Sequence, residues 1–130
     1  MRKIRERDCR MQKKVGKISE RVIKVLGLNM DAETPIYMGE SNVNHMMQRH
    51  PSDYEKYGDK IPEILNQPDY VGRNPSDGSI EYVKEFLIEG EYVKVAVRIS
   101  GTGKYYARSL YVLNANRVHN FIAKGTLKRP

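Results

Sequence analysis

Apolar and polar positions follow two different spacings along this chain. In the first half, apolar residues recur three or four positions apart, as over residues 2–27 and 42–50, which is typical of amphipathic helices. From residue 80 onward, runs rich in valine, tyrosine and isoleucine are separated by glycine turns, which is typical of antiparallel strands. Helices followed by such a meander predict an α+β fold.

The predicted elements form a basic N-terminal segment and a larger domain. We expect an amphipathic helix or linker over residues 1–27, with Gly27 as its stop, and a folded domain over 28–130. Within the domain, the pattern predicts extended structure over 34–41, helices over 42–50, 62–66 and 116–125, and strands over 80–88, 91–100 and 104–114. Docking on the domain, binding a partner and linking to a larger assembly are all open roles for the N-terminal segment.

The hairpin over residues 94–114 carries polar chemistry on one face. With the turn centred on Thr102 and Gly103, this face is predicted to hold the pairs Ser100 with Tyr105, Arg98 with Ala107, Ala96 with Ser109, and Lys94 with Tyr111. The small alanines leave a hollow, and the basic and hydroxyl side chains around it are donors that suit phosphate. Arg108 falls on the apolar face by alternation, so it either reaches the sheet edge or marks a bulge. We expect substrate contacts from Lys94, Lys104, Tyr105, Arg108 and Tyr111. The alternative is an ordinary solvated sheet surface.

The net charge of +7 is distributed unevenly along the chain. Residues 92–130 hold 8 Lys and Arg and no acidic residue, residues 28–91 hold 5 against 13, and residues 1–27 hold 10 against 3. Because an acid-free basic segment attracts polyanions, nucleic acid is the expected partner. No apolar run approaches the about 20 residues of a membrane span, no signal peptide is visible, and Cys9 is the single cysteine. A cytoplasmic protein without membrane partners is predicted.

Two histidines of the predicted helix 42–50 are candidates for proton transfer. His50 falls with Met46 and Met47 on the helical wheel, so a packed histidine is the simpler interpretation for it, whereas His45 points to the other side. The two are five residues apart, no carboxylate is well placed beside them and no Cys/His cluster is present, so no metal or cofactor is predicted. Histidine, arginine and lysine without a metal suggest RNA cleavage through the 2′-OH of the RNA itself.

Part of the chain resembles a known nuclease family. The stretch "HMMQRHPSDYEKYGDKIPEILNQPDYVGRNPSDGSIEYVKEF" and the strands "VKVAVRIS" and "YYARSLYVLN" resemble the phage-borne branch of the Barnase–EndoU–Colicin–RelE-like (BECR) nucleases, over roughly residues 40 to 125. The resemblance implies helices packed on one face of a roughly four-stranded antiparallel sheet, with a metal-independent ribonuclease site on the open face. It implies catalytic roles for His45, His50, Lys84, Arg98 and Ser109. Lys84 and Arg98 are alternatives for one basic strand position, and Glu85 is a candidate base.

The predicted function is a metal-independent endoribonuclease that leaves a 2′,3′-cyclic phosphate. Its setting would be a toxin-like effector of a phage or mobile element, with RNA such as tRNA as substrate and an immunity or phage structural protein as a candidate partner. Two alternatives are a non-catalytic nucleic-acid-binding module and a phage assembly protein that uses the N-terminal helix as its contact.

Overall fold

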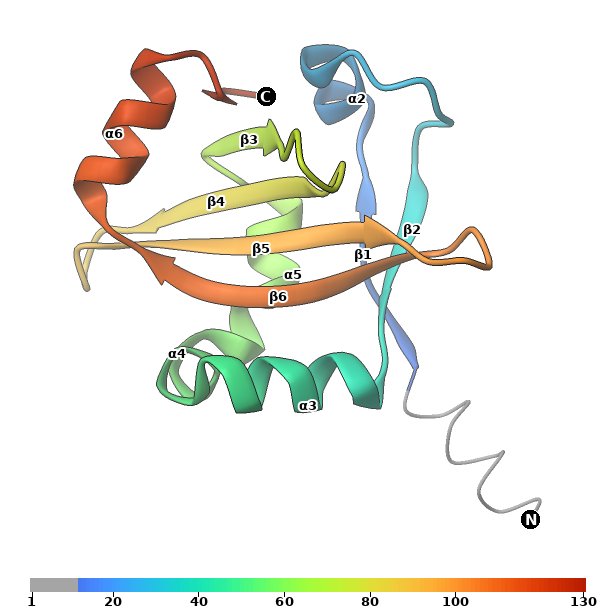
Figure 1. The fold of residues 1–130 in the computed structure, drawn as a ribbon, viewed down its shortest axis with the longest axis horizontal. Helices are drawn as coiled ribbons and strands as arrows, with labels where there is room; N and C mark the ends of the chain where they lie inside the picture. The colour runs from blue at the N-terminus through green and yellow to red at the C-terminus, as the bar shows by residue number, and fades with distance from the viewer. Residues whose placement is uncertain (1–11) are drawn as a thin grey trace.

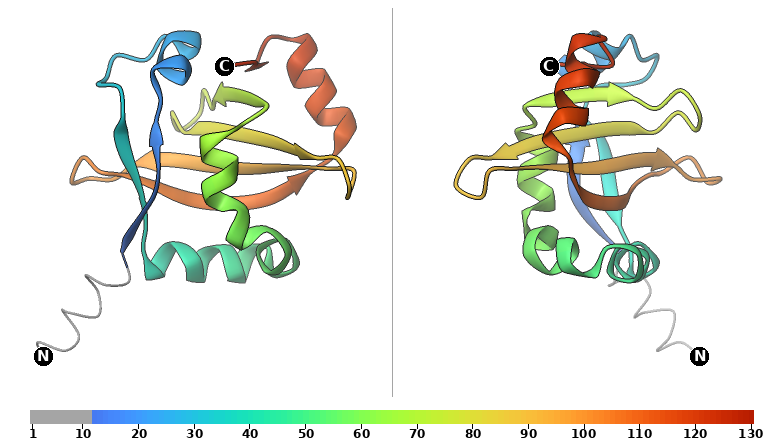
Figure 2. Two further views of the ribbon diagram at one scale, coloured as in Figure 1. Left: turned by 180° about the vertical axis from the view of Figure 1, so that it is seen from behind. Right: turned by 60° about the vertical axis from the view of Figure 1, so that its left-hand side comes forward.

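The computed structural model describes residues 12–130, which form one β-sheet with helices against both faces and alongside β6 (Figure 1, Figure 2). The strands are β1 (Lys13–Ile18), β2 (Thr34–Met38), β3 (Tyr70–Arg73), β4 (Ile80–Phe86), β5 (Glu91–Ile99), β6 (Tyr105–Leu113) and β7 (Leu127–Lys128). The helices are α2 (Glu20–Leu26), α3 (Glu40–Arg49), α4 (Pro51–Tyr57), the 3-10 turn η1 (Gly58–Lys60), α5 (Ile61–Asn66) and α6 (Ala115–Ala123). None of the described helices is long and apolar enough to cross a membrane.

The sheet is larger than predicted, and it is mixed. Its order is β1-β2-β6-β5-β4-β3-β7, seven strands in the described part of the chain. β2 pairs with β6 in parallel, Ile36 with Tyr105 and Tyr37 with Tyr106, while the other neighbours are antiparallel. The expectation of a roughly four-stranded antiparallel sheet with helices on one face is therefore wrong, although the α+β class holds. β1 and β2 extend the meander on one side, and β3 and β7 extend it on the other.

The N-terminal segment contains a strand followed by a helix. The spacing of Val15, Ile18 and Val22 fits a helix, but Lys13–Ile18 is a strand that pairs with β2. Ser19 then caps α2, because its side chain accepts a hydrogen bond from the Val22 backbone N–H at 3.3 Å. The helix prediction is wrong for residues 13–18 and confirmed for 20–26, and its part over residues 1–11 lies outside the described residues. Because Val15, Ile18 and Val22 are all buried in the main core, β1 and α2 are structural parts of the domain.

Apolar side chains pack on both faces of the β4–β6 meander. On one face, β5 contributes residues such as Val95 to a main core that it shares with Ile64 of α5. On the other face, Val118 of α6 packs on Val83 and Leu113 in a smaller core. Figure 1 shows α6 at one end of this second face only. We call the end beneath α6, with Val83, Tyr92 and Leu113, the covered half. The other end, with Glu81, Lys94, Ala96, Arg98 and Ser109, is the open half.

The β5–β6 hairpin contains a bulge at Arg108. The observed pairs are Lys94 with Tyr111, Ala96 with Ser109, Val97 with Ala107, Arg98 with Tyr106 and Ile99 with Tyr105. Between the second and third pairs β6 has one extra residue, Arg108, so the strand shifts there by one position. The first two pairs confirm the prediction, while the predicted partners Tyr105 for Ser100 and Ala107 for Arg98 are wrong. As a result, Tyr106 takes the place on the open half that strand alternation predicts for Tyr105.

Candidate active site

Lys94 of β5 is a fixed cation of the open half. Its Nζ lies 2.9 Å from Glu81 Oε2 and 4.9 Å from the centre of the Tyr111 ring. The side chains of Lys94 and Glu81 are only 12% and 13% exposed. Burial alone would lower the pKa of Lys94, but the neighbouring Tyr111 side chain and the ion pair with Glu81 outweigh it and raise the pKa above its ordinary value. Lys94 therefore supplies a positive charge in a defined position at neutral pH.

Glu81 of β4 is a site residue that sequence reasoning missed. It pairs with Ala96 across the strands, and its Oε2 accepts hydrogen bonds from Lys94 and, at 3.3 Å, from Asn74 Nδ2. Within the described residues, its Oε1 accepts no hydrogen bond. The hairpin alone is free of acids, but β4 lies beside β5 in the sheet and adds a carboxylate to the same face. Strand alternation puts Glu81 on the same face of β4 as Val83. The signal that could have found Glu81 is therefore the pattern of β4 rather than that of the hairpin.

His50 reaches this cluster from the end of α3. Its ring stacks on Tyr111, with centroids 4.9 Å apart and an interplanar angle of 26°. His50 is the C-cap of α3, and Pro51 begins α4 directly after it. Asp53 of α4 then accepts a hydrogen bond from the Val112 backbone N–H at 3.0 Å, which ties the start of α4 to β6. The sequence indicated a packed histidine at position 50, and the residue that it packs against is Tyr111.

His45, by contrast, is exposed on α3. It comes three residues after Asn42 and four before Arg49, so these three residues share one flank of the helix. The side chain of His45 forms no hydrogen bond or ion pair within the described residues. The structure therefore brings His50, rather than His45, into contact with the residues around Lys94.

The centre of the open half is formed by small side chains. Ala96 and Ser109 face each other across β5 and β6, and both are partly exposed. Ala107, which the predicted hollow also required, lies instead on the opposite face, where it is fully buried in the main core. The small side chains at this centre are therefore those of Ala96 and Ser109, beside Lys94, and Ala107 does not contribute to it.

Four other predicted residues lie away from Lys94, Tyr111 and His50. Arg98 extends toward Asp77 of the β3–β4 turn, with Nη1 3.9 Å from Oδ2. Lys104 lies over the Tyr37 ring at 5.1 Å. Tyr105 packs against the main core, and Lys84 is on that same face of the sheet, where its Nζ donates to the Gln67 carbonyl at 2.9 Å. The structure does not bring these four residues together.

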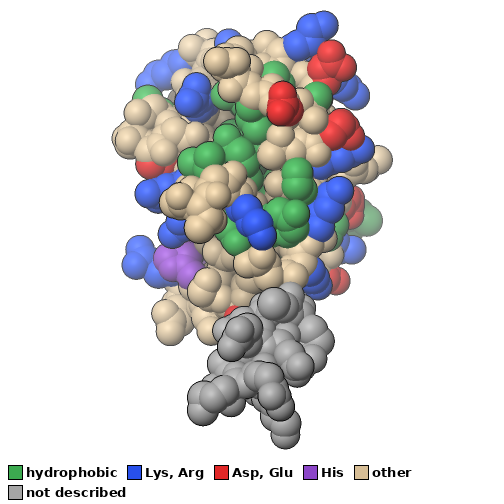
Figure 3. All heavy atoms as spheres, turned by 90° about the vertical axis from the view of Figure 1, so that its right-hand side faces the viewer, with side chains coloured by type: hydrophobic (Ala, Val, Ile, Leu, Met, Phe, Trp, Pro, Cys, Tyr) green, Lys and Arg blue, Asp and Glu red, His purple; other side chains and the backbone are tan. Residues whose placement is uncertain are grey.

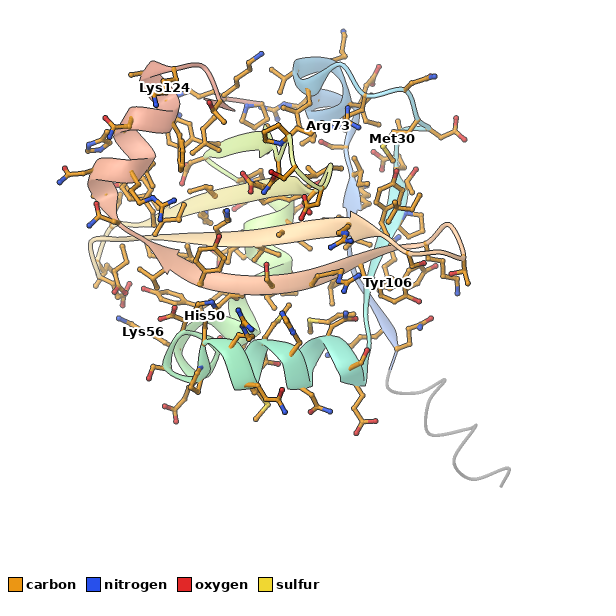
Figure 4. All side chains as sticks on the ribbon, viewed as in Figure 1. Met30, His50, Lys56, Arg73, Tyr106 and Lys124 are labelled. Atoms are coloured by element: carbon orange, nitrogen blue, oxygen red, sulfur yellow. The ribbon has the colours of Figure 1, made fainter. Side chains whose placement is uncertain are left out.

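Arg108 is placed by the bulge at the edge of a hollow between β6 and the start of α3. This hollow has a volume of 440 Å³, and its lining includes Arg108, Tyr106 and Asn42. His50 and Tyr106 lie at opposite ends of the stretch along which α3 runs beside β6 (Figure 4). Seen from the β5–β6 turn, hydrophobic side chains occupy the middle of the surface, with Lys and Arg side chains around them (Figure 3). The open half therefore extends along β6 from the Lys94 cluster to the hollow beside Arg108 and Tyr106.

Three kinds of functional group lie along this face. The ammonium of Lys94 lies beside the carboxylate of Glu81 and over the ring of Tyr111, and the imidazole of His50 stacks on that ring. Such groups can accept and donate a proton and stabilise a negatively charged transition state. Over residues 12–130 no group of three or more His, Cys, Asp or Glu side chains is arranged to hold a metal ion.

A family model of nucleases of the BECR type matches residues 13–120, which is most of the chain. The chain belongs to this family, described as phage-Barnase-EndoU-ColicinE5/D-RelE like nuclease3. No curated protein and no solved structure matches the chain. The resemblance seen in the sequence is confirmed, and the matched region begins at residue 13 rather than near residue 40, so it includes β1, α2 and β2.

Proposed function

We propose that the protein is an endoribonuclease that cleaves RNA through the RNA's own 2′-OH, without a metal ion. The observation that carries this proposal is the arrangement around Lys94, whose ammonium is fixed between the Glu81 carboxylate and the Tyr111 ring, with His50 stacked on that ring. Membership of a nuclease family supports phosphodiester cleavage in general. The cluster supplies the acid, base and cation that an RNA-specific route requires.

In the proposed reaction, Glu81 accepts the proton of the 2′-OH while the 2′ oxygen forms a bond to phosphorus. The bond from phosphorus to the 5′ oxygen of the next nucleotide breaks, and His50 in its protonated form donates a proton to that oxygen. The products are a 2′,3′-cyclic phosphate and a free 5′-OH. Lys94 stabilises the charge that develops on the phosphate oxygens, and the hydroxyl of Ser109 donates a further hydrogen bond to them. Arg98 and Arg108 bind neighbouring phosphates.

The assignment of the acid to His50 rests on its contact with Tyr111. His45 has no such contact, yet it is on the same helix and its imidazole could donate a proton to a substrate that lies along α3. The two variants His45→Ala and His50→Ala therefore need to be compared in one assay. We expect His50→Ala to lose cleavage and His45→Ala to retain most of it.

The chemistry is tested with a fluorescent RNA oligonucleotide that has a single 2′-deoxy substitution. The cleaved position is first mapped on the all-RNA strand and on tRNA in buffer with EDTA, and the product ends are identified. A 2′-deoxy residue on the 5′ side of the cleaved bond should abolish cleavage there, whereas the same substitution two positions away should not. Cleavage that survives the first substitution, or that EDTA abolishes, would overturn the proposed mechanism.

The biological setting that we propose is a toxin-like effector of a phage or mobile element that acts on cytoplasmic RNA, with an immunity protein as its partner. The phage origin of the family supports this setting. Induced expression in a bacterial host should stop growth, and the His50→Ala variant should not. Tight RNA binding without cleavage in either assay would instead favour a non-catalytic nucleic-acid-binding module.

A further inference from the structure

The hollow beside Tyr106 differs in character from the Lys94 cluster. Tyr106 lies at the start of β6, its ring lines the hollow, and its hydroxyl accepts a hydrogen bond from Gln12 Nε2 at 2.8 Å. The ring of Tyr37 on β2 lies 6.2 Å away and tilted by 49°, so a second aromatic side chain supports the first. An aromatic ring fixed in this way at the wall of an open hollow is a platform on which a planar group can stack.

Most of the other side chains at this hollow are neutral hydrogen-bonding groups. They are the amides of Gln12 and Asn42 and the hydroxyls of Ser41 and Ser100. The charged side chains in the lining, Glu40 and Arg108, have opposite signs. A hollow with one carboxylate and one guanidinium does not select an anion, but amides and hydroxyls match the polar edge of a nucleobase.

A second hollow at this end of the molecule shows the contrast. Its volume is 390 Å³, and it is lined by Arg73, Asp77 and Arg98 together with apolar side chains such as Met30. Figure 4 shows Arg73 and Met30 between the α2–β2 connection and the end of β3. Its polar lining contains one amide, that of Asn29, and the Tyr105 side chain besides these three charged groups, so charged groups are more numerous here than in the hollow beside Tyr106.

The position of Arg108 connects the Tyr106 hollow to the proposed reaction centre. Arg108 lines the hollow, and the next residue, Ser109, is in the centre of the open half opposite Ala96. Within residues 12–130 the Arg108 guanidinium forms no hydrogen bond or ion pair, so it can bind a phosphate that lies between the two places. Tyr106 is five residues from Tyr111, which is about 17 Å along a strand. An extended RNA strand can span both places.

We propose that this hollow, which we call the Tyr106 pocket, binds one unpaired nucleobase of the RNA substrate, next to the cleaved bond. The base stacks on Tyr106, its edge contacts the amides of Gln12 and Asn42, and Arg108 binds the intervening phosphate. A base held in a double helix cannot enter such a pocket, so the substrate is single-stranded RNA or an unpaired loop. This inference rests on the proposed ribonuclease function and names the substrate class of that site.

The experiment uses a set of RNA oligonucleotides in which one position at a time lacks its base. For the wild-type protein, kcat/KM should fall by about tenfold or more when the missing base is at one particular position beside the cleaved bond. The Tyr106→Leu variant should show that lower rate on the intact strand and no further loss from the missing base, because the two changes remove the same contact. Tyr106→Phe, which keeps the ring, should restore the wild-type pattern.

Tyr70→Leu is the matched control. Tyr70 is also partly buried at the sheet surface, and its hydroxyl also accepts one side-chain hydrogen bond, from Arg129 at 3.2 Å, but it lies in the covered half. This variant should keep the wild-type dependence on the missing base. The pocket assignment is overturned if wild type cleaves all the strands alike, or if Tyr106→Leu still loses activity at the same position.

Binding of the same strands, measured by fluorescence anisotropy, distinguishes failure of this inference from failure of the ribonuclease proposal. If wild type cleaves none of them, the ribonuclease proposal fails. The pocket is then supported if one missing base weakens binding in wild type but not in Tyr106→Leu, and overturned if both proteins bind all strands equally. An intact duplex of the same sequence should be cleaved at least about tenfold more slowly than the single strand, and equal rates would contradict the substrate class.

Discussion

Two histidines meet tyrosines on one face of the sheet, one in the open half and one in the covered half. His50 stacks on Tyr111 with centroids 4.9 Å apart, and His119 of α6 meets Tyr92 edge-on at 6.0 Å. The residue types are the same, but the neighbours differ. Both tyrosines pack against the smaller core, but Tyr111 also lies beside the ammonium of Lys94, whereas the cross-strand neighbour of Tyr92 on β4 is the carboxylate residue Glu85.

A nearly buried cation beside the tyrosine, rather than the residue types, separates the candidate site from the packing around it. The covered half loses its contact with water because α6 packs its apolar side on Val83 and Leu113. The open half keeps a nearly buried ion pair, Lys94 with Glu81, next to the small side chains of Ala96 and Ser109. Changes in the open half should therefore affect cleavage, and changes in the covered half should affect stability.

The largest expected effect separates the two histidines. His50→Ala removes the proposed acid and should lower the cleavage rate about a hundredfold or more. Its stability should fall by no more than about 1.5 kcal/mol, the value of one aromatic contact. The matched variant His119→Ala should cleave at the wild-type rate. Cleavage assays and thermal unfolding by circular dichroism measure both quantities, and equal losses of activity in the two variants would contradict the division between the halves.

The next largest effect is on stability and belongs to the covered half. Leu113 is buried beneath α6, so Leu113→Ala should lower the free energy of unfolding by about 2–5 kcal/mol through lost apolar contacts and a cavity. The cleavage rate, corrected for the fraction of protein that is folded, should stay at the wild-type value. Urea unfolding and activity measured on the same samples provide both numbers. A folded variant without activity would show that the covered half takes part in the reaction.

A smaller effect is expected from filling the centre of the open half. Ala96→Leu adds a branched side chain opposite Ser109, where a phosphate would have to approach Lys94. Cleavage should fall about tenfold because the reacting groups are displaced, while the free energy of unfolding should change by less than about 0.5 kcal/mol. Ala115→Leu, at the exposed start of α6, is the size-matched control and should leave cleavage unchanged. An active Ala96→Leu variant would place the scissile phosphate elsewhere.

The hairpin shows how far sequence alone could predict this site. Alternation and a turn at Thr102 and Gly103 gave the correct pairs Lys94 with Tyr111 and Ala96 with Ser109. The pairs nearer the turn were wrong because the actual turn is one residue tighter. The bulge at Arg108 then restores the expected register. The tighter turn and the bulge shift the register in opposite directions and cancel. The pairs at the far end of the hairpin are therefore predictable, whereas the position of Tyr106 on the open half is not.

Other features of the site depend on packing that no local pattern encodes. Val15 and Ile18 are three residues apart, a spacing that fits both a helix and a bulged strand, so periodicity alone predicts a helix where β1 lies. Glu81 enters the site because β4 lies beside β5, and His50 does so because α3 ends next to β6. The sequence predicted the residue types and the family, while the neighbours of each residue came from the tertiary fold.

The smallest expected effect concerns the pH dependence of stability. Burial opposes the charged form of Lys94, but the neighbouring Tyr111 side chain and the ion pair with Glu81 outweigh it, so the pKa of Lys94 is raised in the folded protein. A raised pKa means that the charged lysine stabilises the folded state below its unfolded pKa of about 10.4, and that this contribution is lost as pH rises through the higher folded value. The stability difference between wild type and Lys94→Met should therefore be constant between about pH 6 and 9 and should shrink at higher pH. The difference for Leu113→Ala should not change over this range, because no charge is involved. Urea unfolding at a series of pH values measures both differences. A Lys94→Met difference that shrinks already near neutral pH would show that the ammonium is not held by Glu81 and Tyr111.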